Sequence, residues 1–551
     1  MCERIRLGMF ALLALTLTVA NAKGEEPSTQ QIIERLDKME KDNKDLQKMV
    51  QDQQRLIEQL TPVKTETKKS ETKDTPKKEP EPTTKTWEVG ENRKVSGNWN
   101  NGLTFESEDK AFRMTVGGVT QFDMGWYSAD KEQVRSIGTF NNLIDPGQTL
   151  EDGMSFRRAR LRMSGVAYEQ IEFFAQYEFA NSIDLRQRTL GITNSTGVAT
   201  PNVTNFDPAD GIAFNEVYIG LVKLPVVGNI RVGRHRESFN FVTATSDNNQ
   251  VWLERGLMFE GFNGNYNFSN GITASRTYLD DRMYTLFGLF MQNNNNGRQF
   301  ATVGDGLYAY DMRITGVPIR DEDEQLWVHI GFDYTYRNLN QENVRYRARP
   351  NVRVGSGFQV PNVVDSGNIF SRNGQQIANL EFASAWGPWS FATEATVSTV
   401  ANAFSGGLPL PNGQLPSGVT SRGTYVATGG YVELLRFLTP DHRGYVKDRP
   451  GYARVIPSRR FFLLEGDDGH SVWDTGAWEV GVRYDYIDLT DNGFNGGSAQ
   501  GVTAAVNWYF SSNMRIQANL SWMNRDFNPS DNAGRLDGDL TAFGLRFNCD
   551  F

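Results

Sequence analysis

The chain has 551 residues, of which 39% are hydrophobic and 22% charged, and it carries a formal net charge of −9. After the first twenty residues no apolar run approaches the roughly 18 to 20 residues that a membrane-spanning helix needs, which excludes a helical membrane protein. A transmembrane β-barrel stays open, because its strands alternate apolar and polar residues and look polar on average.

The N-terminus has the pattern of a secretory signal. Two arginines precede an apolar stretch from Leu7 to Ala20, and Ala20-Asn21-Ala22 supplies the small residues of a cleavage site. We therefore predict a signal peptide at residues 1–22; the alternative is a buried N-terminal helix. No cysteine follows the apolar stretch, which argues against a lipoprotein. Removal of the signal would take Cys2 with it and leave Cys549 alone, so that no disulfide can form within the mature chain.

Residues 23–60 are predicted to form a periplasmic coiled coil. From Gln30 to Leu60 apolar residues recur at alternating spacings of four and three, with no Gly or Pro between them. Asn43 stands at one seam position, where a polar residue usually fixes register and oligomer state. The alternative is a lone amphipathic helix on a globular core. Residues 61–86, rich in Thr, Pro, Lys and Glu, are predicted to be a disordered linker.

Beyond residue 86, segments with two-residue alternation keep returning. In Ser155–Gly165 arginines alternate with apolar residues. The arginines are Arg158, Arg160 and Arg162, and the apolar residues are Ala159, Leu161 and Met163. Such segments run to about ten residues, several with Trp or Tyr near one end, which fits transmembrane strands better than the shorter strands of a soluble sandwich.

The connections between these segments alternate between short and long, as expected for a transmembrane barrel. Taking 259–279 as one broken strand gives sixteen strands from about Arg113 to Phe551. We predict an all-β fold, a 16-stranded antiparallel transmembrane β-barrel within residues 87–551, behind the N-terminal α-helical coiled coil. An even number of strands places both barrel ends in the periplasm. The connection 439–475 is unusually long for the periplasmic side.

Several motifs resemble the phosphate-selective porin O and P family. They are FRRARLRMSG (156–165), IRVGRHRESF (230–239), VWLERG (251–256), YVELLRFLTPDHR (431–443), WEVGVRYDYIDLTDNG (478–493), VNWYFSSNMRIQANL (506–520) and GLRFNCDF (544–551). The resemblance covers essentially all of 110–551. It implies a sixteen-stranded outer-membrane barrel, usually trimeric, with arginines in the lumen and a third extracellular loop folded inward. Phe551 resembles the terminal aromatic residue that outer-membrane proteins present to the barrel assembly machinery.

The chain departs from the family pattern in the expected constriction loop. The phosphate channels carry a lysine a few residues before the Glu-Arg pair, whereas here Asn248 precedes Glu254-Arg255. The usual Lys-Glu-Pro-Phe is replaced by Arg236-Glu237-Ser238-Phe239. These departures leave the expectation of a channel intact and argue against tight phosphate selectivity.

Known catalytic patterns are missing from the sequence. The four histidines are scattered, and HExxH, GxSxG and P-loop motifs do not occur. A Ser/His/Asp or acidic site assembled in space stays open, but we expect no enzyme, no cofactor, no metal site and no nucleic-acid partner.

The arginine ladder of Ser155–Gly165 favours transport. Its steps are about 6.8 Å, from a rise of about 3.4 Å per residue. On the lipid face each arginine would cost about 2 to 4 kcal/mol near the midplane, so the lumen is the expected side. There the ladder would pass anions between equivalent sites. The alternative is that it pairs with Glu172 and Glu178 on the neighbouring strand and only stabilises the wall.

A second group of arginines leads into the candidate constriction loop, residues 237–257. We predict these pore-lining, anion-binding residues: Arg158, Arg160, Arg162, Arg231, Arg234, Arg236 and Arg255. The second group could instead bind carboxylates of extracellular loops. A further basic cluster in 439–475 could receive anions leaving the pore or be solvated. Its members are Arg443, Lys447, Arg449, Arg454, Arg459 and Arg460.

The sequence thus predicts an outer-membrane porin of a Gram-negative-type cell, with its stalk in the periplasm. It would be a passive diffusion channel for small hydrophilic solutes, with a modest preference for anions, phosphate among them. Expected partners are outer-membrane lipid, two further copies in a homotrimer, the barrel assembly machinery through Phe551, and peptidoglycan through the stalk. The alternative function is a structural tether between outer membrane and cell wall, with a largely closed barrel.

Overall fold

The computed structural model divides the chain into two compact units, Met1–Thr86 and Trp87–Phe551, and describes residues of the second. The description runs from 94 to 551, with gaps at 100–101, 130–149, 151, 181–184, 190–191, 194–198, 201–203, 209–212, 238, 264–267, 292–306, 340–342, 355–359, 361, 462–473 and 528–536. The predicted signal peptide, coiled coil and linker lie outside the described residues.

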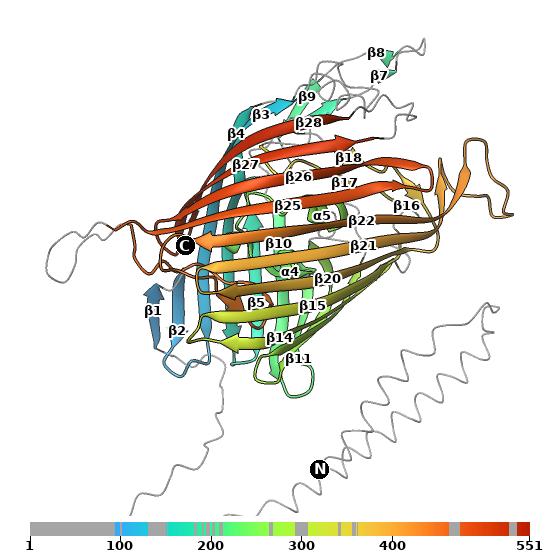
Figure 1. Ribbon diagram of the computed structural model, residues 1–551. Helices are drawn as coiled ribbons and strands as arrows, with labels where there is room; N and C mark the ends of the chain where they lie inside the picture. The colour runs from blue at the N-terminus through green and yellow to red at the C-terminus, as the bar shows by residue number, and fades with distance from the viewer. Residues whose placement is uncertain are drawn as a thin grey trace, which may run out of the picture. The chain divides into compact units, whose positions relative to one another are not determined.

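Sixteen long strands form one antiparallel barrel (Figure 1). They are β3 (Arg113–Ala129), β4 (Gly153–Ala167), β5 (Ile171–Glu178), β10 (Ala213–Leu224), β11 (Gly228–Arg236), β12 (Phe268–Tyr278), β13 (Met283–Met291), β14 (Tyr308–Asp321), β15 (Leu326–Arg337), β20 (Gln375–Trp386), β21 (Trp389–Ser405), β22 (Thr420–Phe437), β25 (Ala477–Asp491), β26 (Phe494–Tyr509), β27 (Met514–Asp526) and β28 (Gly538–Asp550). The last strand pairs with the first, with Leu545 opposite Met124, which closes the barrel. The predicted barrel is therefore confirmed.

The expectation of one broken strand over 259–279 is wrong. Leu257–Phe262 forms the helix α5, and β12 begins only at Phe268. The helix is apolar apart from Glu260 and Gly261, and all its residues except Glu260 are buried. A helix that is apolar on nearly every side packs best inside a protein. The strand count stays at sixteen because β12 alone supplies the sixth strand.

The described part of the chain also contains shorter strands and helical elements. The strands are β1 (Val95–Trp99), β2 (Leu103–Ser107), β6 (Leu185–Thr189), β7 (Ile192–Thr193), β8 (Ala199–Thr200), β9 (Thr204–Pro208), β16 (Asn343–Val344), β17 (Arg347–Ala348), β18 (Val364–Asp365), β19 (Ile369–Phe370), β23 (Tyr445–Val446) and β24 (Gly451–Tyr452). The helical elements besides α5 are α4 (Phe241–Ala244) and the 3₁₀ turn η3 (Asp247–Asn249). Among the described residues, no helix combines the length and the apolar character needed to cross a bilayer.

The barrel wall shows the alternation that the sequence predicts. On β4, Leu161 and Met163 are 43% and 41% exposed, whereas Arg158 is only 5% exposed. On β26, Val502 and Val506 face outward, while Thr503 is buried. Because successive side chains of a strand point to opposite faces, the outer face of the barrel is apolar and the inner face polar.

Three connections fold into the barrel and supply its apolar core. They are the inward loop, Glu237–Asn263; the second inward loop, Asn343–Ser371; and the turn segment, Leu438–Phe461. Phe262 of the first packs on Tyr346 of the second, with 5.7 Å between ring centroids. Phe241 of the first packs on Tyr452 of the turn segment at 4.9 Å. The interior is thus filled by segments that hold one another in place.

The turn segment starts at the end of the barrel where the connections are short. Phe437, the last residue of β22, donates its N–H to the carbonyl of Pro388 in the turn between β20 and β21. From there the segment turns inward, and Arg443 is fully buried. The interpretation of the basic cluster in 439–475 as solvated is therefore wrong for Arg443. It holds for Arg459, whose side chain is 67% exposed.

Candidate functional site

The inward loop crosses the barrel and is held by the opposite wall. The N–H groups of Phe241 and Val242 donate to the Glu394 carboxylate on β21 at 3.1 and 3.0 Å. The N–H of Leu253 donates to Asn519 Oδ1 on β27 at 2.9 Å. These bonds bring loop backbone to strands more than a hundred residues away in the sequence.

Glycine is required at one bend of this loop. Gly256 has φ +97°, a left-handed conformation that L side chains rarely adopt. A Cβ at this position would also collide with the carboxylate of Asp485. Gly256 therefore lets the loop lie against the wall just before α5 begins.

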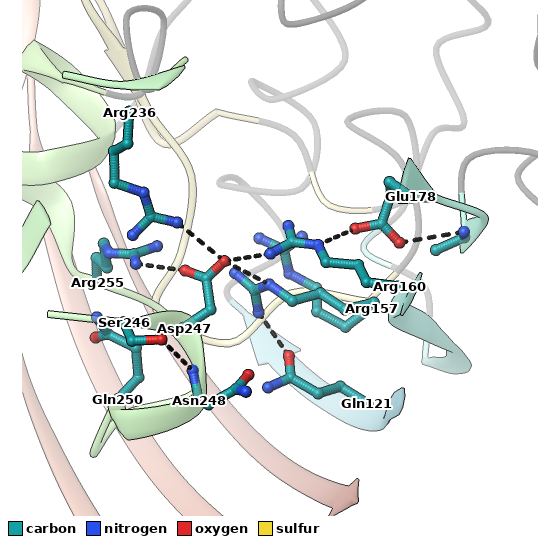
Figure 2. A network of polar contacts seen from close by, with 12 residues as sticks. Gln121, Arg157, Arg160, Glu178, Arg236, Ser246, Asp247, Asn248, Gln250 and Arg255 are labelled. Atoms are coloured by element: carbon teal, nitrogen blue, oxygen red, sulfur yellow. Dashed lines mark hydrogen bonds and ion pairs between the residues drawn. The ribbon is translucent and has the colours of Figure 1, made fainter. Parts of the chain in front are cut away.

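Four arginines converge on the carboxylate of Asp247, the first residue of η3 (Figure 2). Arg160 Nη1 lies 2.5 Å from Asp247 Oδ2, and Arg236 Nη2 lies 3.2 Å from the same oxygen. Arg158 Nε lies 3.3 Å from it, and Arg255 binds the other oxygen, Oδ1. All five side chains are less than a tenth exposed. We call these five residues the Asp247 cluster.

The charges of the cluster fix the ionisation of its acid. Burial on its own would raise the pKa of Asp247, but the charges of Arg158, Arg236, Arg255 and Arg160 hold this pKa well below its usual range. Burial, aided by the charge of Arg236 and opposed by Asp247, lowers the pKa of Arg255 to about 10, which leaves this side chain protonated at neutral pH.

A β-bulge in β4 turns two adjacent arginines inward. Arg158 pairs with Gln121 and Phe156 with Phe122, so the register of β3 and β4 shifts and Arg157 is the extra residue. Arg157 donates from Nε to Glu254 Oε1 at 2.7 Å, while Phe156 stays exposed on the outer face. Strict alternation would place Arg157 outside, so sequence reasoning missed it.

A second charged group surrounds Glu254 on the same loop. Its carboxylate binds Arg157 and, at 2.6 Å, Arg353 of the second inward loop. Arg546 on β28 lies 3.6 Å from it, donates to the carbonyl of Leu253, and pairs with Asp123 on β3 at 2.6 Å. Although burial opposes it, the charges of Arg157 and Arg353 hold the pKa of Glu254 well below its usual range.

The structure brings together four of the seven arginines that the sequence singles out. Arg158, Arg160, Arg236 and Arg255 meet at Asp247. Arg231 instead forms two 3.0 Å bonds to Glu172 on β5. Arg234 donates from Nε to the carbonyl of Phe214 at 3.2 Å. Arg162 lies one step further along β4, and its Nε is buried without a hydrogen bond in the described part of the chain.

The alternative interpretation, pairing of the β4 arginines with Glu172 and Glu178 on β5, holds for one arginine only. Arg160 binds Glu178 at 2.5 Å, but Glu172 is bound by Arg231.

Sequence reasoning missed Asp247 itself, which stands in a polar loop with no pattern to mark it. Asn248, which replaces the expected lysine, donates weakly to Asp550 Oδ2 on β28 at 3.4 Å.

Because the pKa of Asp247 is low, the effect of this residue on ion selectivity should not depend on pH between pH 8 and pH 5. A group with a depressed pKa stays ionised until the pH falls through that value, so its charge is constant from pH 8 to pH 5. The difference in anion-to-cation permeability between the unmodified protein and Asp247→Asn should therefore be the same at both pH values. Reversal potentials in planar bilayers measure it. A difference that shrinks at pH 5 would contradict the assigned ionisation of Asp247. Groups that titrate alike in the two proteins do not contribute to this difference.

Comparison with known proteins gives one family. The sequence pattern of the family "Phosphate-selective porin O and P" matches residues 136–551. The chain is 25% identical to Porin O of Pseudomonas aeruginosa over 468 residues, which cover 81% of this chain and 90% of that protein. It is 27% identical to an uncharacterized protein of Caulobacter vibrioides over 332 residues, which cover 58% of this chain and 59% of that protein.

Two solved structures match most of the chain at low sequence identity. The channel DcaP of Acinetobacter baumannii matches with a TM-score of 0.43 and 8% identity, covering 81% of this chain and 99% of that one. Salmonella typhi OmpF in complex with daunomycin matches with a TM-score of 0.40 and 12% identity, covering 82% and 100%.

Proposed function

Because the chain belongs to the phosphate-selective porin O and P family and is an outer-membrane channel, we propose that it is a passive diffusion channel for small hydrophilic solutes with a modest preference for anions. The Asp247 cluster is the observation that carries this proposal. Its four arginines contact the carboxylate of Asp247, and one of them, Arg160, also binds Glu178, which leaves 4 − 2 = +2 charges among these six groups.

A local excess of this size outweighs the chain's net charge of −9. Selectivity follows the field in the narrowest part of a pore, where screening is weakest, and charges beyond a Debye length of about 8 Å contribute little at physiological salt. Anions should therefore be enriched at the inward loop although the protein as a whole is acidic.

Strong binding of one anion needs more than a positive field. It requires converging donors that replace the anion's lost hydration. In the Asp247 cluster the guanidinium groups already bind a carboxylate, and Asn248 adds no charge beside it. We therefore infer a preference among ions without high-affinity phosphate binding.

The direct test is a measurement of ion selectivity. Reversal potentials of the purified protein across a salt gradient should show a preference for chloride over potassium at low salt. This preference should weaken as salt rises, because screening lowers the field. Micromolar phosphate should leave the chloride current unchanged. A cation-selective pore, or block by micromolar phosphate, would contradict the proposal.

A structural tether is the second candidate function. The observation that favours it is the filling of the barrel by the inward loop, the second inward loop and the turn segment. A tether would need no conducting path, so single-channel conductance separates the two functions. Discrete, ohmic openings support the channel, and a silent barrel in a folded protein supports the tether.

We infer a homotrimer, with residues 23–60 as a parallel periplasmic coiled coil that could reach peptidoglycan. We also infer recognition by the barrel assembly machinery through Phe551, because this residue continues the pairing with Gly118 of β3 while its side chain is exposed.

A further inference from the structure

The Asp247 cluster has more positive charge and more donors than one carboxylate can satisfy. Arg158, Arg160 and Arg236 share a single oxygen, Oδ2. The Nε of Arg236 is buried and forms no hydrogen bond among the described residues, and the Nε of Arg158 has only the 3.3 Å ion pair with Oδ2. These two side chains are only 6% and 7% exposed. Three guanidinium groups thus compete for one oxygen of Asp247.

A tetrahedral anion would fit this arrangement better than a carboxylate does. An aspartate offers two oxygens and one negative charge, whereas phosphate or sulfate at neutral to basic pH offers four oxygens and up to two charges. Guanidinium groups bind such oxygens with strong, charge-assisted hydrogen bonds. The carboxylate of Asp247 therefore stands where a permeating anion would find its best contacts.

The arginines are held in place independently of Asp247. Arg236 Nη1 donates to the carbonyl of Thr243 at 3.1 Å. Arg255 donates from Nε to the carbonyl of Val242 at 3.1 Å and from Nη2 to that of Thr245 at 3.2 Å. Arg158 donates from Nη1 to Gln121 at 2.6 Å. Removing the charge of Asp247 should leave these guanidinium groups where they are.

The backbone around Asp247 also has its own supports. Ser246 Oγ accepts from the N–H of Asn248 at 3.4 Å, and Asn249 Nδ2 donates to the carbonyl of Tyr452 at 3.0 Å. Gln250 Nε2 donates to the carbonyl of Thr245 at 3.1 Å. An asparagine at 247 has the same shape as aspartate, so η3 should keep its position.

We propose that Asp247 is a tethered anion that competes with the permeating anion for Arg158, Arg160, Arg236 and Arg255, and that it thereby keeps the channel from binding tetrahedral anions tightly. This inference rests on the proposed anion-preferring channel. It assigns Asp247 the role of a specificity-determining residue. Without its charge, the four arginines should form a saturable site for inorganic phosphate.

The test compares phosphate block of the chloride current at pH 8 in four proteins: the unmodified chain, Asp247→Asn, Asp247→Glu and Asp280→Asn. Asp280 is exposed in the turn between β12 and β13, so Asp280→Asn removes one charge away from the cluster. Asp247→Asn should be half-blocked at a phosphate concentration about tenfold or more below that for the unmodified chain. Asp247→Glu keeps the competing charge and should need more phosphate for half-block than Asp247→Asn, and Asp280→Asn should behave like the unmodified chain.

Other outcomes would overturn the inference. If Asp247→Asn is blocked no more strongly than the unmodified chain, Asp247 does not compete with phosphate. If it conducts both potassium and chloride better, without saturable block, Asp247 only holds the loop in place. Failure of the proposed function has a separate readout, a cation-selective reversal potential of the unmodified protein. Mobility on gels before and after heating, compared with that of the unmodified protein, verifies that each variant is folded.

Discussion

Replacing Arg158 and Arg160 together with glutamine should shift the permeability ratio of chloride to potassium toward potassium by about tenfold. The two changes take the sum of these charges from +2 to 0, because two guanidinium groups, Arg236 and Arg255, and two carboxylates, Asp247 and Glu178, would remain. The field that enriches anions at the inward loop would disappear. Reversal potentials at low salt measure the ratio.

The double variant Arg282→Gln/Arg320→Gln is the matched control. It removes two arginines as well, but Arg282 lies in the turn after β12 and Arg320 at the end of β14, beside the next short turn. The control should leave the permeability ratio nearly unchanged. Equal shifts in both double variants would mean that total charge, rather than the cluster, sets selectivity.

Arg443→Ala should lower the free energy of unfolding by about 3 to 5 kcal/mol, the range for breaking a buried ion pair. Arg443 is fully buried and binds Glu479 at 2.8 and 2.6 Å, Tyr509 Oη at 2.8 Å, and the carbonyl of Asn249 at 3.3 Å. Without it, the carboxylate of Glu479 loses its guanidinium partner in the barrel interior. Denaturant unfolding followed by tryptophan fluorescence measures the loss.

The loss of stability in Arg443→Ala should come from the unpaired carboxylate of Glu479. The double variant Arg443→Met/Glu479→Gln removes both charges and should recover much of the lost stability. Arg459→Ala in the same segment, with a side chain 67% exposed and 3.7 Å from Asp474, should change stability by less than about 0.5 kcal/mol. If Arg443→Ala is as mild as Arg459→Ala, the turn segment is not anchored by this pair.

Arg443→Ala should also change conduction. The turn segment touches the inward loop through Tyr452, whose N–H donates to Thr245 Oγ1 at 3.1 Å. Loss of the anchor should release this contact and raise single-channel conductance, whereas Arg459→Ala should not. A lower conductance would show that the segment, once released, blocks the path rather than clearing it.

The sequence predicts the barrel well because its physical signal is local. Leu161 and Met163 meet the apolar surroundings and Arg158 the interior, and a two-residue period records that difference along a single strand. The two-residue alternation gives the wrong face for Arg157, because a β-bulge inserts this residue and no residue type in the sequence marks the bulge. It also fails at α5, where buried apolar residues in a helix look like those of a buried strand.

Only the arginines of the candidate site could be predicted from the sequence. Arg158, Arg160, Arg236 and Arg255 stand in motifs that resemble the family's, and these are the four that meet. Their shared acid was not predictable, because nothing in a short polar loop indicates which side chain will face a strand almost ninety residues earlier. The interior position of Arg443 depends likewise on Glu479 and Asn249, which lie on separate elements.

The pairing of Arg546 links barrel closure to formation of the inward loop's final position. Arg546 belongs to the last strand, and the residue it binds on the first strand, Asp123, lies 423 positions earlier. The same guanidinium also donates to the carbonyl of Leu253 on the inward loop. Contacts between such distant residues form late in folding, because a very long chain segment must be ordered before they are made. The selective part of the pore should therefore mature in the same step that seals the wall, and a nascent barrel still open between β3 and β28 would lack it.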